Sequence, residues 1–298
     1  YEDYVQKHIF TPLRMKHSYT SKEAALANGL ITGHQQWCGF PIAVPNQRIP
    51  VASLPSGQLI SSAEDMGVYL IAQLNQGNAV LSREGLELMH QPAARVDMAD
   101  KDMGYYGMGW FVNEIKGQKI VFHYGEVPDY FAYMAMLPDH NRAIVLLINT
   151  NEQFYTFALW MLGEAAALSL AGVPLEPFGW SILPWALRSA LLLPVLQIIL
   201  IAISMWRLKG KRLGLFKRPV NPRVWIFHLV LPTVFNLILI LIPVAILASG
   251  LFDFLMLFIG DLLSVFVLSG IIALIWIIVR TSLILGVFLK SGQQMENI

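Results

Sequence analysis

The strongest constraint on this sequence is a set of three long apolar segments after residue 180, at about 182–206, 224–249 and 262–284. Each is long enough to cross a bilayer, which takes about 20 apolar residues in a helix. Only 14% of all residues are charged, against about 25% in a typical soluble domain. We therefore expect residues 176–298 to form an all-α, three-helix transmembrane region in a lipid bilayer, and residues 1–175 to fold as a separate globular domain.

The charges between these segments predict an orientation. The loop between the first two spans has no acidic residue and contains seven basic ones, Arg207, Lys209, Lys211, Arg212, Lys217, Arg218 and Arg223. Basic loops stay on the cytoplasmic side. The sequence thus predicts a multi-pass protein of the cell membrane, with residues 1–179 extracytoplasmic and the C-terminus cytoplasmic. The apolar stretch 252–260 is bracketed by Asp253 and Asp261, and is predicted as an interfacial hairpin.

The polar residues inside the spans favour a simple anchor. Gln197 and Asn236 are the main interior polar groups, and the charged residues sit at the span edges. Transport pathways usually place charged groups inside the membrane. Polar contacts between helices explain Gln197 and Asn236 without a transport role.

Several function classes are disfavoured by composition. The net charge of +1 gives no reason to expect nucleic-acid binding. Cys38 is the single cysteine, so the chain can form no internal disulfide and no cysteine-based zinc site. The histidines show no ligand spacing, and we expect no metal and no cofactor. An exported domain without disulfides fits a bacterial protein.

The first 175 residues predict an α+β fold, with an antiparallel sheet flanked by helices. Helical spacing over 1–10 ends before Pro12, and residues 28–59 look irregular because they are rich in Gly and Pro. Further helices are expected after the caps Ser61 or Ser62, after Ser82, and over about 152–170. Between them the period changes to two, which predicts strands at 106–114, 118–124, 130–138 and 142–150.

Four passages, in order, carry a resemblance to a known family: Ile9–Met15 with Ser18–Thr20, Pro55–Met66, Tyr106–Trp110, and His123–Gly125 with Pro138 and Leu146–Asn149. Over about residues 1–170 the chain resembles the serine beta-lactamase and penicillin-binding-protein-like hydrolases, nearest the class C and esterase-like branch. The membrane tail is similar to that of a subgroup with the hydrolase domain outside. Two positions depart from the family pattern, since Arg14 and Asp129 stand where the family has Gly.

The resemblance implies acyl transfer to a serine, with Ser-x-x-Lys supplying the nucleophile and Tyr-x-Asn a proton shuttle. No serine here is followed three residues later by Lys, and no tyrosine two residues later by Asn. In the family both motifs precede the first matched passage. The sequence also begins at Tyr1 without Met or a signal peptide. We therefore expect a fragment that holds the C-terminal half of the hydrolase domain and is inactive alone.

By the same resemblance, His123 is a catalytic residue and the backbone N–H of Glu126 is an oxyanion-hole donor. Gly125 lets a substrate approach the strand, whose edge can pair with an extended acyl-peptide. Tyr124 either binds substrate or is simply packed. Without the resemblance, a lone His on a strand is more often a structural residue.

Together these features predict a membrane-anchored serine hydrolase. In its full length it would act outside the cytoplasmic membrane on a peptide, amide or ester. The alternative is a non-catalytic, penicillin-binding-like sensor or binding protein tethered to the membrane.

Overall fold

The computed structural model describes residues 1–45, 53–75, 80–98, 101–175, 182–209, 223, 226 and 230–296. The chain divides into two compact units. The first comprises Tyr1–Gln36 and Pro41–Trp180, and the second comprises Ser181–Ile298 together with the short segment Trp37–Phe40. Each unit is described by itself.

The first unit is built on a six-stranded sheet in which all neighbours are antiparallel and follow chain order. Its strands are β3 (Ala94–Met98), β4 (Lys101–Tyr106), β5 (Phe111–Ile115), β6 (Gln118–Val127), β7 (Tyr130–Leu137) and β8 (Arg142–Ile148). This arrangement confirms the predicted α+β fold with an antiparallel sheet. The period-two pattern after residue 117 matches β6, β7 and β8 closely, because each of these strands buries alternate residues against a helix.

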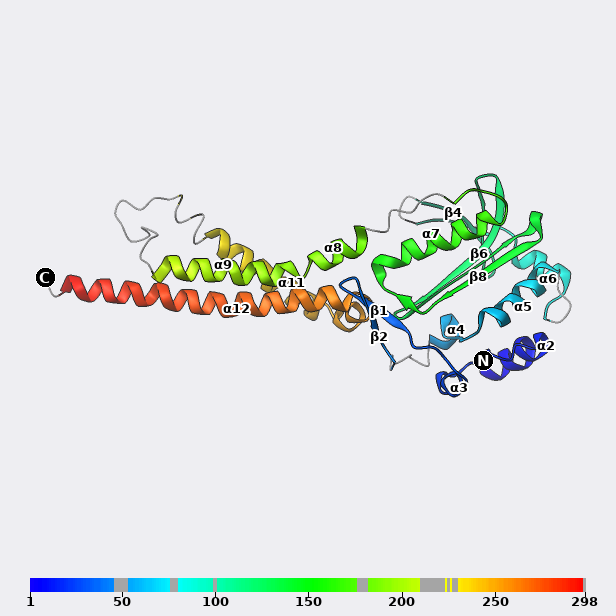
Figure 1. The fold of residues 1–298 in the computed structure, drawn as a ribbon, viewed down its shortest axis with the longest axis horizontal. Coiled ribbons are helices and arrows are strands. Elements are labelled where there is room, and N and C mark those ends of the chain that lie inside the picture. The colour runs from blue at the N-terminus through cyan, green and yellow to red at the C-terminus, as the bar shows by residue number, and fades with distance from the viewer. Residues whose placement is uncertain are drawn as a thin grey trace. The chain divides into compact units, whose positions relative to one another are not determined.

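Helices cover both faces of this sheet (Figure 1), with α7 (Gln153–Ser169) along one face and α5 (Ala63–Leu74) along the other. Alternation along β6 supplies both cores. Phe122 packs in a cluster with Trp160 of α7, whereas Val121 packs in a second cluster with Leu70 of α5. The sheet is therefore the central layer of the first unit, and β6 runs through its middle.

Three shorter helices of this unit are α3 (Lys22–Ala27), α4 (Leu54–Gly57) and α6 (Arg83–Met89). Ser62 and Ser82 cap α5 and α6, as predicted, since each hydroxyl accepts the backbone N–H three residues later. These caps fix where both helices begin.

The N-terminal helix ends later than the sequence predicted. It runs without a break through α1 (Glu2–Val5), the π-helical turn η1 (Gln6–Phe10) and α2 (Thr11–Leu13). Pro12 does not end it, because the helical backbone continues through Pro12 to Leu13. The helix ends at Arg14, whose φ of 57° is left-handed. Glycine favours this conformation, which explains why the family has Gly there.

Two regions contain strands that the sequence did not predict. Residues 28–59 were expected to be irregular, yet β1 (His34–Trp37) and β2 (Phe40–Ala43) form a small sheet in which β1 pairs in parallel with β9 (Thr150–Asn151). The second region holds β3 and most of β4, which precede the first predicted strand, and the predicted strand 106–114 is the end of β4 and most of β5. Gly109, with a φ of 80°, lies in the bend between them.

In the second unit, the part of the chain that the structure describes contains three helices long and apolar enough to cross a membrane: Pro184–Trp206, Leu231–Ala248 and Ile259–Leu283. They belong to α8 (Leu183–Ser189) with α9 (Leu192–Lys209), to α11 (Leu231–Ala248) and to α12 (Phe252–Glu296). Most of the basic loop lies outside the described residues.

Polar contacts join these helices, as expected for an anchor. Gln197 Nε2 of α9 donates to Asn236 Oδ1 of α11 at 3.3 Å and to the Ser269 carbonyl of α12 at 3.0 Å. The hairpin predicted at 252–260 is wrong, because this stretch is the first part of α12, with a single non-helical residue at Ile259. Apolar runs bounded by charges do not distinguish a hairpin from a kinked helix.

Candidate active site

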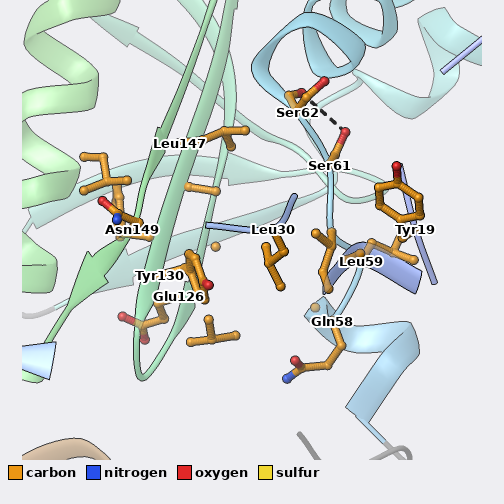
Figure 2. Close-up of a pocket in the computed structure, with 18 of the residues that line it drawn as sticks. Tyr19, Leu30, Gln58, Leu59, Ser61, Ser62, Glu126, Tyr130, Leu147 and Asn149 are labelled. Carbon is orange, nitrogen blue, oxygen red and sulfur yellow. Dashed lines mark hydrogen bonds between the residues drawn. The ribbon is translucent and has the colours of Figure 1, made fainter. Parts of the chain in front are cut away.

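The first unit contains a cavity of about 850 Å³ between the sheet and the segments that precede α5 and surround α3. Figure 2 shows the labelled side chains lining it from two sides. The sheet side contributes Glu126, Tyr130, Leu147 and Asn149, and the opposite side contributes Tyr19, Leu30, Gln58, Leu59, Ser61 and Ser62. All four residues that the sequence placed in the site, His123, Tyr124, Gly125 and Glu126, line this cavity.

These four residues lie on β6 beyond the point where β5 stops pairing with it. The pairing of β5 with β6 ends at Phe111↔Phe122, whereas β7 continues to pair with β6 as far as Val127↔Tyr130. No strand among the described residues pairs with the β5 side of β6 after Phe122, and that side borders the cavity. Such an edge can accept an extended peptide-like segment through backbone hydrogen bonds.

The pairing register also predicts which groups point toward the cavity. Val127 and Tyr130 flank a two-residue turn and form the last pair of the ladder. In a tight hairpin such a pair exchanges its hydrogen bonds, and the next pair along does not. The next pair is Glu126↔Phe131. The N–H of Glu126 therefore points away from β7, toward the open edge, as an oxyanion-hole donor requires.

His123 lies half-buried at the start of the open edge. Its Nε2 is 3.1 Å from the hydroxyl of Tyr106, and its ring centroid lies 5.6 Å from that of Phe111. Burial lowers the pKa of His123, and a hydrogen bond to the backbone of Tyr124 opposes that shift. The imidazole is therefore held largely neutral near pH 7, which suits a group that exchanges protons.

Tyr106 is a site residue that sequence reasoning missed. It belongs to the third matched passage, Tyr106–Trp110. The residue lies at the end of β4, and its register partner is Phe111. No spacing rule connects it to His123, because the contact depends on how β4 and β5 pair. Only the fold brings the two residues together.

Tyr124 and Gly125 differ in what they offer. Tyr124 lines the cavity, but its ring also packs in the core, 6.3 Å from Trp160 and 6.0 Å from Phe111. Burial, and then the nearby Glu126 charge, raise the pKa of its hydroxyl, so it stays protonated. Gly125 leaves open space, since an added Cβ would meet only the Ala132 Cβ at 3.9 Å. A ligand backbone can approach the strand there.

A buried carboxylate orders the opposite wall. Asp65 accepts the backbone N–H of Lys16 at 3.2 Å and of His17 at 2.6 Å, and the Ser18 hydroxyl at 2.7 Å. The Ser18 hydroxyl also lies 2.7 Å from that of Ser61, which lines the cavity. This network joins the first two matched passages and fixes the wall that faces His123.

The turn between β6 and β7 supports the other end of the cavity. Asp129 is buried there and has no left-handed φ, so the turn does not need the glycine found in the family. Burial raises the pKa of Asp129, and the charge of Lys22 opposes this. The Tyr130 hydroxyl donates to the Ile31 carbonyl, and the Asp129 carbonyl accepts the His34 N–H at 3.3 Å. These bonds hold residues 31–34 against the turn.

The serines of the cavity have local structural roles. Ser56 donates to the Ser53 carbonyl at 2.8 Å, Ser62 caps α5, and Ser61 contacts Ser18. Within the described residues, no group of three or more His, Cys, Asp or Glu could hold a metal ion.

Fold and cavity together define an α+β domain with a ligand-sized cavity along an open strand edge. The beta-lactamase family model matches residues 1–167, more than half of the chain. The chain therefore belongs to the beta-lactamase family, whose members include serine hydrolases.

Two curated relatives illustrate the range of the family. Protein flp of Staphylococcus aureus (strain MW2) is 26% identical over 160 residues, which cover 52% of this chain and 30% of flp. Unguisins hydrolase ungD' of Aspergillus campestris is 26% identical over 156 residues, covering 50% of this chain and 29% of the relative. The chain thus spans about a third of the length of the curated relatives it matches.

Solved structures with similar regions include an octameric penicillin-binding protein homologue from Pyrococcus abyssi. It is 26% identical, with a TM-score of 0.44, over 54% of this chain and 37% of that one. The D-amino acid amidase of Ochrobactrum anthropi is 18% identical, with a TM-score of 0.49, over 58% of this chain and 51% of that one.

Proposed function

We propose that the full-length protein is a membrane-anchored serine hydrolase that acts outside the cytoplasmic membrane on a peptide, amide or ester. The observation that carries this proposal is the cavity at the open edge of β6, with His123 and the Glu126 backbone on one strand. Family membership supports acyl-serine chemistry. The three apolar helices and the basic loop support the membrane anchor and its orientation.

In this mechanism the described residues bind and polarise the acyl group, and the nucleophile motif comes from sequence upstream of Tyr1. An extended substrate pairs with the β6 edge beside Gly125, which brings its carbonyl oxygen to the Glu126 N–H. That donor stabilises the negative charge that develops as the serine oxygen adds to the carbonyl carbon. His123, neutral because it is buried, donates a hydrogen bond or relays a proton as the leaving group departs.

Tyr106 acts as a positioning residue in this scheme, because its hydroxyl reaches His123 Nε2. It fixes the imidazole ring and selects its tautomer. We expect Tyr106→Phe to lower turnover and to change the pH profile of the reaction, since the ring loses its partner. A merely structural role for Tyr106 would leave the shape of that profile unchanged.

The decisive variant is His123→Ala in the full-length protein. We expect turnover of ester or amide substrates to fall by about 100-fold or more, the usual effect of removing a general acid–base group. Acylation by a fluorescent beta-lactam should slow in parallel. His140→Ala is the matched control, because His140 is exposed and bonds only Gln118 among the described contacts. Equal activity of both variants would refute the assigned role of His123.

The second candidate is a non-catalytic binding protein that uses the same cavity. It follows if the sequence upstream of Tyr1 lacks Ser-x-x-Lys and Tyr-x-Asn, because the cavity residues alone can bind a ligand. The upstream sequence and a stoichiometry measurement separate the two. Both motifs together with repeated turnover support the enzyme. Binding of a peptide-like ligand without acylation supports the sensor.

A further inference from the structure

A tight turn far from the apolar segments in sequence belongs to the helical unit. Cys38 and Gly39 connect β1 to β2, and both are left-handed, with φ values of 47° and 73°. Positive φ at both central residues is the signature of a type I′ hairpin turn, which Asn-Gly usually fills. Cysteine is unfavourable in this conformation. Contacts with the helices stabilise this unfavourable conformation of Cys38.

Both sides of the turn backbone are bound by charged side chains of the helices. The Cys38 N–H donates to Asp261 Oδ2 of α12 at 2.7 Å, and the Gly39 carbonyl accepts Arg188 Nη2 of α8 at 2.9 Å. Asp261 is only 3% exposed. A buried carboxylate is costly unless it is hydrogen-bonded, so the turn is a required partner for this helix. The fit is also tight, since a Cβ on Gly39 would lie 2.8 Å from the Pro184 carbonyl.

These contacts fix the depth of the turn relative to the candidate spans. Pro184 is the first residue of one span, and Asp261 lies two residues into another that begins at Ile259. The ends of spanning helices lie at the membrane–water interface. A segment bonded to the ends of two spans must lie at that same level.

The side chains around the turn have the chemistry of that interface. Trp37 is 39% exposed, Phe40 48% and Trp185 67%. The Arg188 guanidinium lies 4.3 Å from the Phe40 ring centroid and 5.0 Å from that of Trp185. Aromatic rings and snorkelling arginines gather at the headgroup level of bilayers. Exposed rings beside a span end therefore suit lipid headgroups better than water.

We infer that the turn Trp37–Phe40 is a membrane-contact element, whose aromatic side chains lie in the phospholipid headgroup region beside the first and third spans. The inference rests on the proposed membrane insertion of the helices. It adds a contact that no apolar segment in the sequence indicates, because this turn precedes the first span by more than 140 residues.

Lipid photolabelling tests this on the unmodified full-length protein. The protein is reconstituted in phosphatidylcholine and phosphatidylglycerol vesicles that contain a phospholipid with a diazirine near its headgroup. After irradiation, adducts are mapped by peptide mass spectrometry in three regions: residues 37–40, residues 182–188 as the positive control, and residues 84–95 of the first unit as the negative control.

We expect adducts at 37–40 at a yield comparable to that at 182–188, and at least about ten times that at 84–95. Labelling of 37–40 no higher than that of 84–95, while 182–188 is labelled, would overturn the inference and leave the membrane anchor intact. A lack of labelling at 182–188 as well would refute the proposed insertion, and the inference with it.

A pair of variants tests the role of the hydrogen bond between Asp261 and the Cys38 N–H. Asp261→Leu removes the acceptor for the Cys38 N–H and should reduce labelling of 37–40 several-fold, while 182–188 stays labelled. Asp253→Leu is the matched control, since Asp253 is an exposed carboxylate in the first turn of the same helix. Equal labelling of 37–40 in both variants would contradict the role of Asp261. If Asp261→Leu does not fold, labelling of the unmodified protein still tests whether residues 37–40 contact the lipid headgroups.

Discussion

Asp65 offers the sharpest test of how the cavity wall is held. Its two carboxylate oxygens accept different backbone groups, Oδ1 from Lys16 and Oδ2 from His17. Asp65→Ala leaves both amides without a partner, and a buried unsatisfied donor costs about 1–3 kcal/mol. The Ser18 hydroxyl loses less, because Ser61 remains 2.7 Å away. We therefore expect Asp65→Ala to lower the free energy of unfolding by about 2–5 kcal/mol.

Asp65→Asn should cost about half as much, because the amide oxygen can still accept one of the two N–H groups. The measurement is urea unfolding of the full-length protein in detergent, followed by near-UV circular dichroism. Glu64→Ala is the matched control, since it removes an exposed carboxylate from the same first turn of α5. That control should cost only about 0.3–1 kcal/mol. The reasoning fails if Asp65→Ala costs no more than Glu64→Ala.

Three further changes probe backbone strain, close packing and protonation. Arg14→Gly should stabilise the fold by about 1 kcal/mol, because a left-handed φ costs residues other than glycine about 1–2 kcal/mol and the greater freedom of glycine in the unfolded chain offsets part of that gain. The control Arg83→Gly in α6 should instead destabilise the fold. Chemical unfolding compares the two variants. Gly33→Ala should destabilise by about 1–3 kcal/mol, because its Cβ would lie 2.5 Å from Asp129 Oδ2 and 2.8 Å from Asp129 Cβ. Gly67→Ala, in open space on α5, should be neutral or stabilising in the same melting assay. In NMR spectra, His123 of the folded protein should titrate below the ordinary histidine pKa of about 6.5. As pH drops, His123 of the unfolded chain is therefore protonated first. The free energy of unfolding falls as pH drops from about 6.5 toward the lower pKa of the folded state. A midpoint at or above the ordinary value would contradict the burial argument.

The parts of the fold that sequence patterns predicted have a strong local cause. The strands after residue 117 alternate because one face of each packs on α5 and the other on α7. The caps Ser62 and Ser82 are visible in sequence because a hydroxyl satisfies a helix end without help from distant residues. The apolar segments are visible because a bilayer imposes a length on them.

The parts that were missed depend on distant partners. The pair Cys38-Gly39 is not a usual hairpin-turn sequence. The β1–β2 turn forms there because Asp261 and Arg188 bind the backbone of these two residues. Tyr106 joins the site only through pairing of β4 with β5. Pro12 predicts a helix end, yet the helix continues through it to Leu13. His123, Gly125 and Glu126 line one cavity, but their roles come from resemblance rather than from periodicity and stay predictions.

The two-residue turn of Pro128 and Asp129 has a consequence beyond connecting two strands. Along β6, every second residue bonds to β7 through its backbone, and the residues between them face the open edge. The β6–β7 turn fixes which residues belong to each set. Val127 flanks the turn and bonds to β7, so the N–H of Glu126, one residue earlier, faces the open edge. The direction of the Glu126 N–H therefore follows from backbone pairing, and substitutions of the Glu126 side chain leave it unchanged.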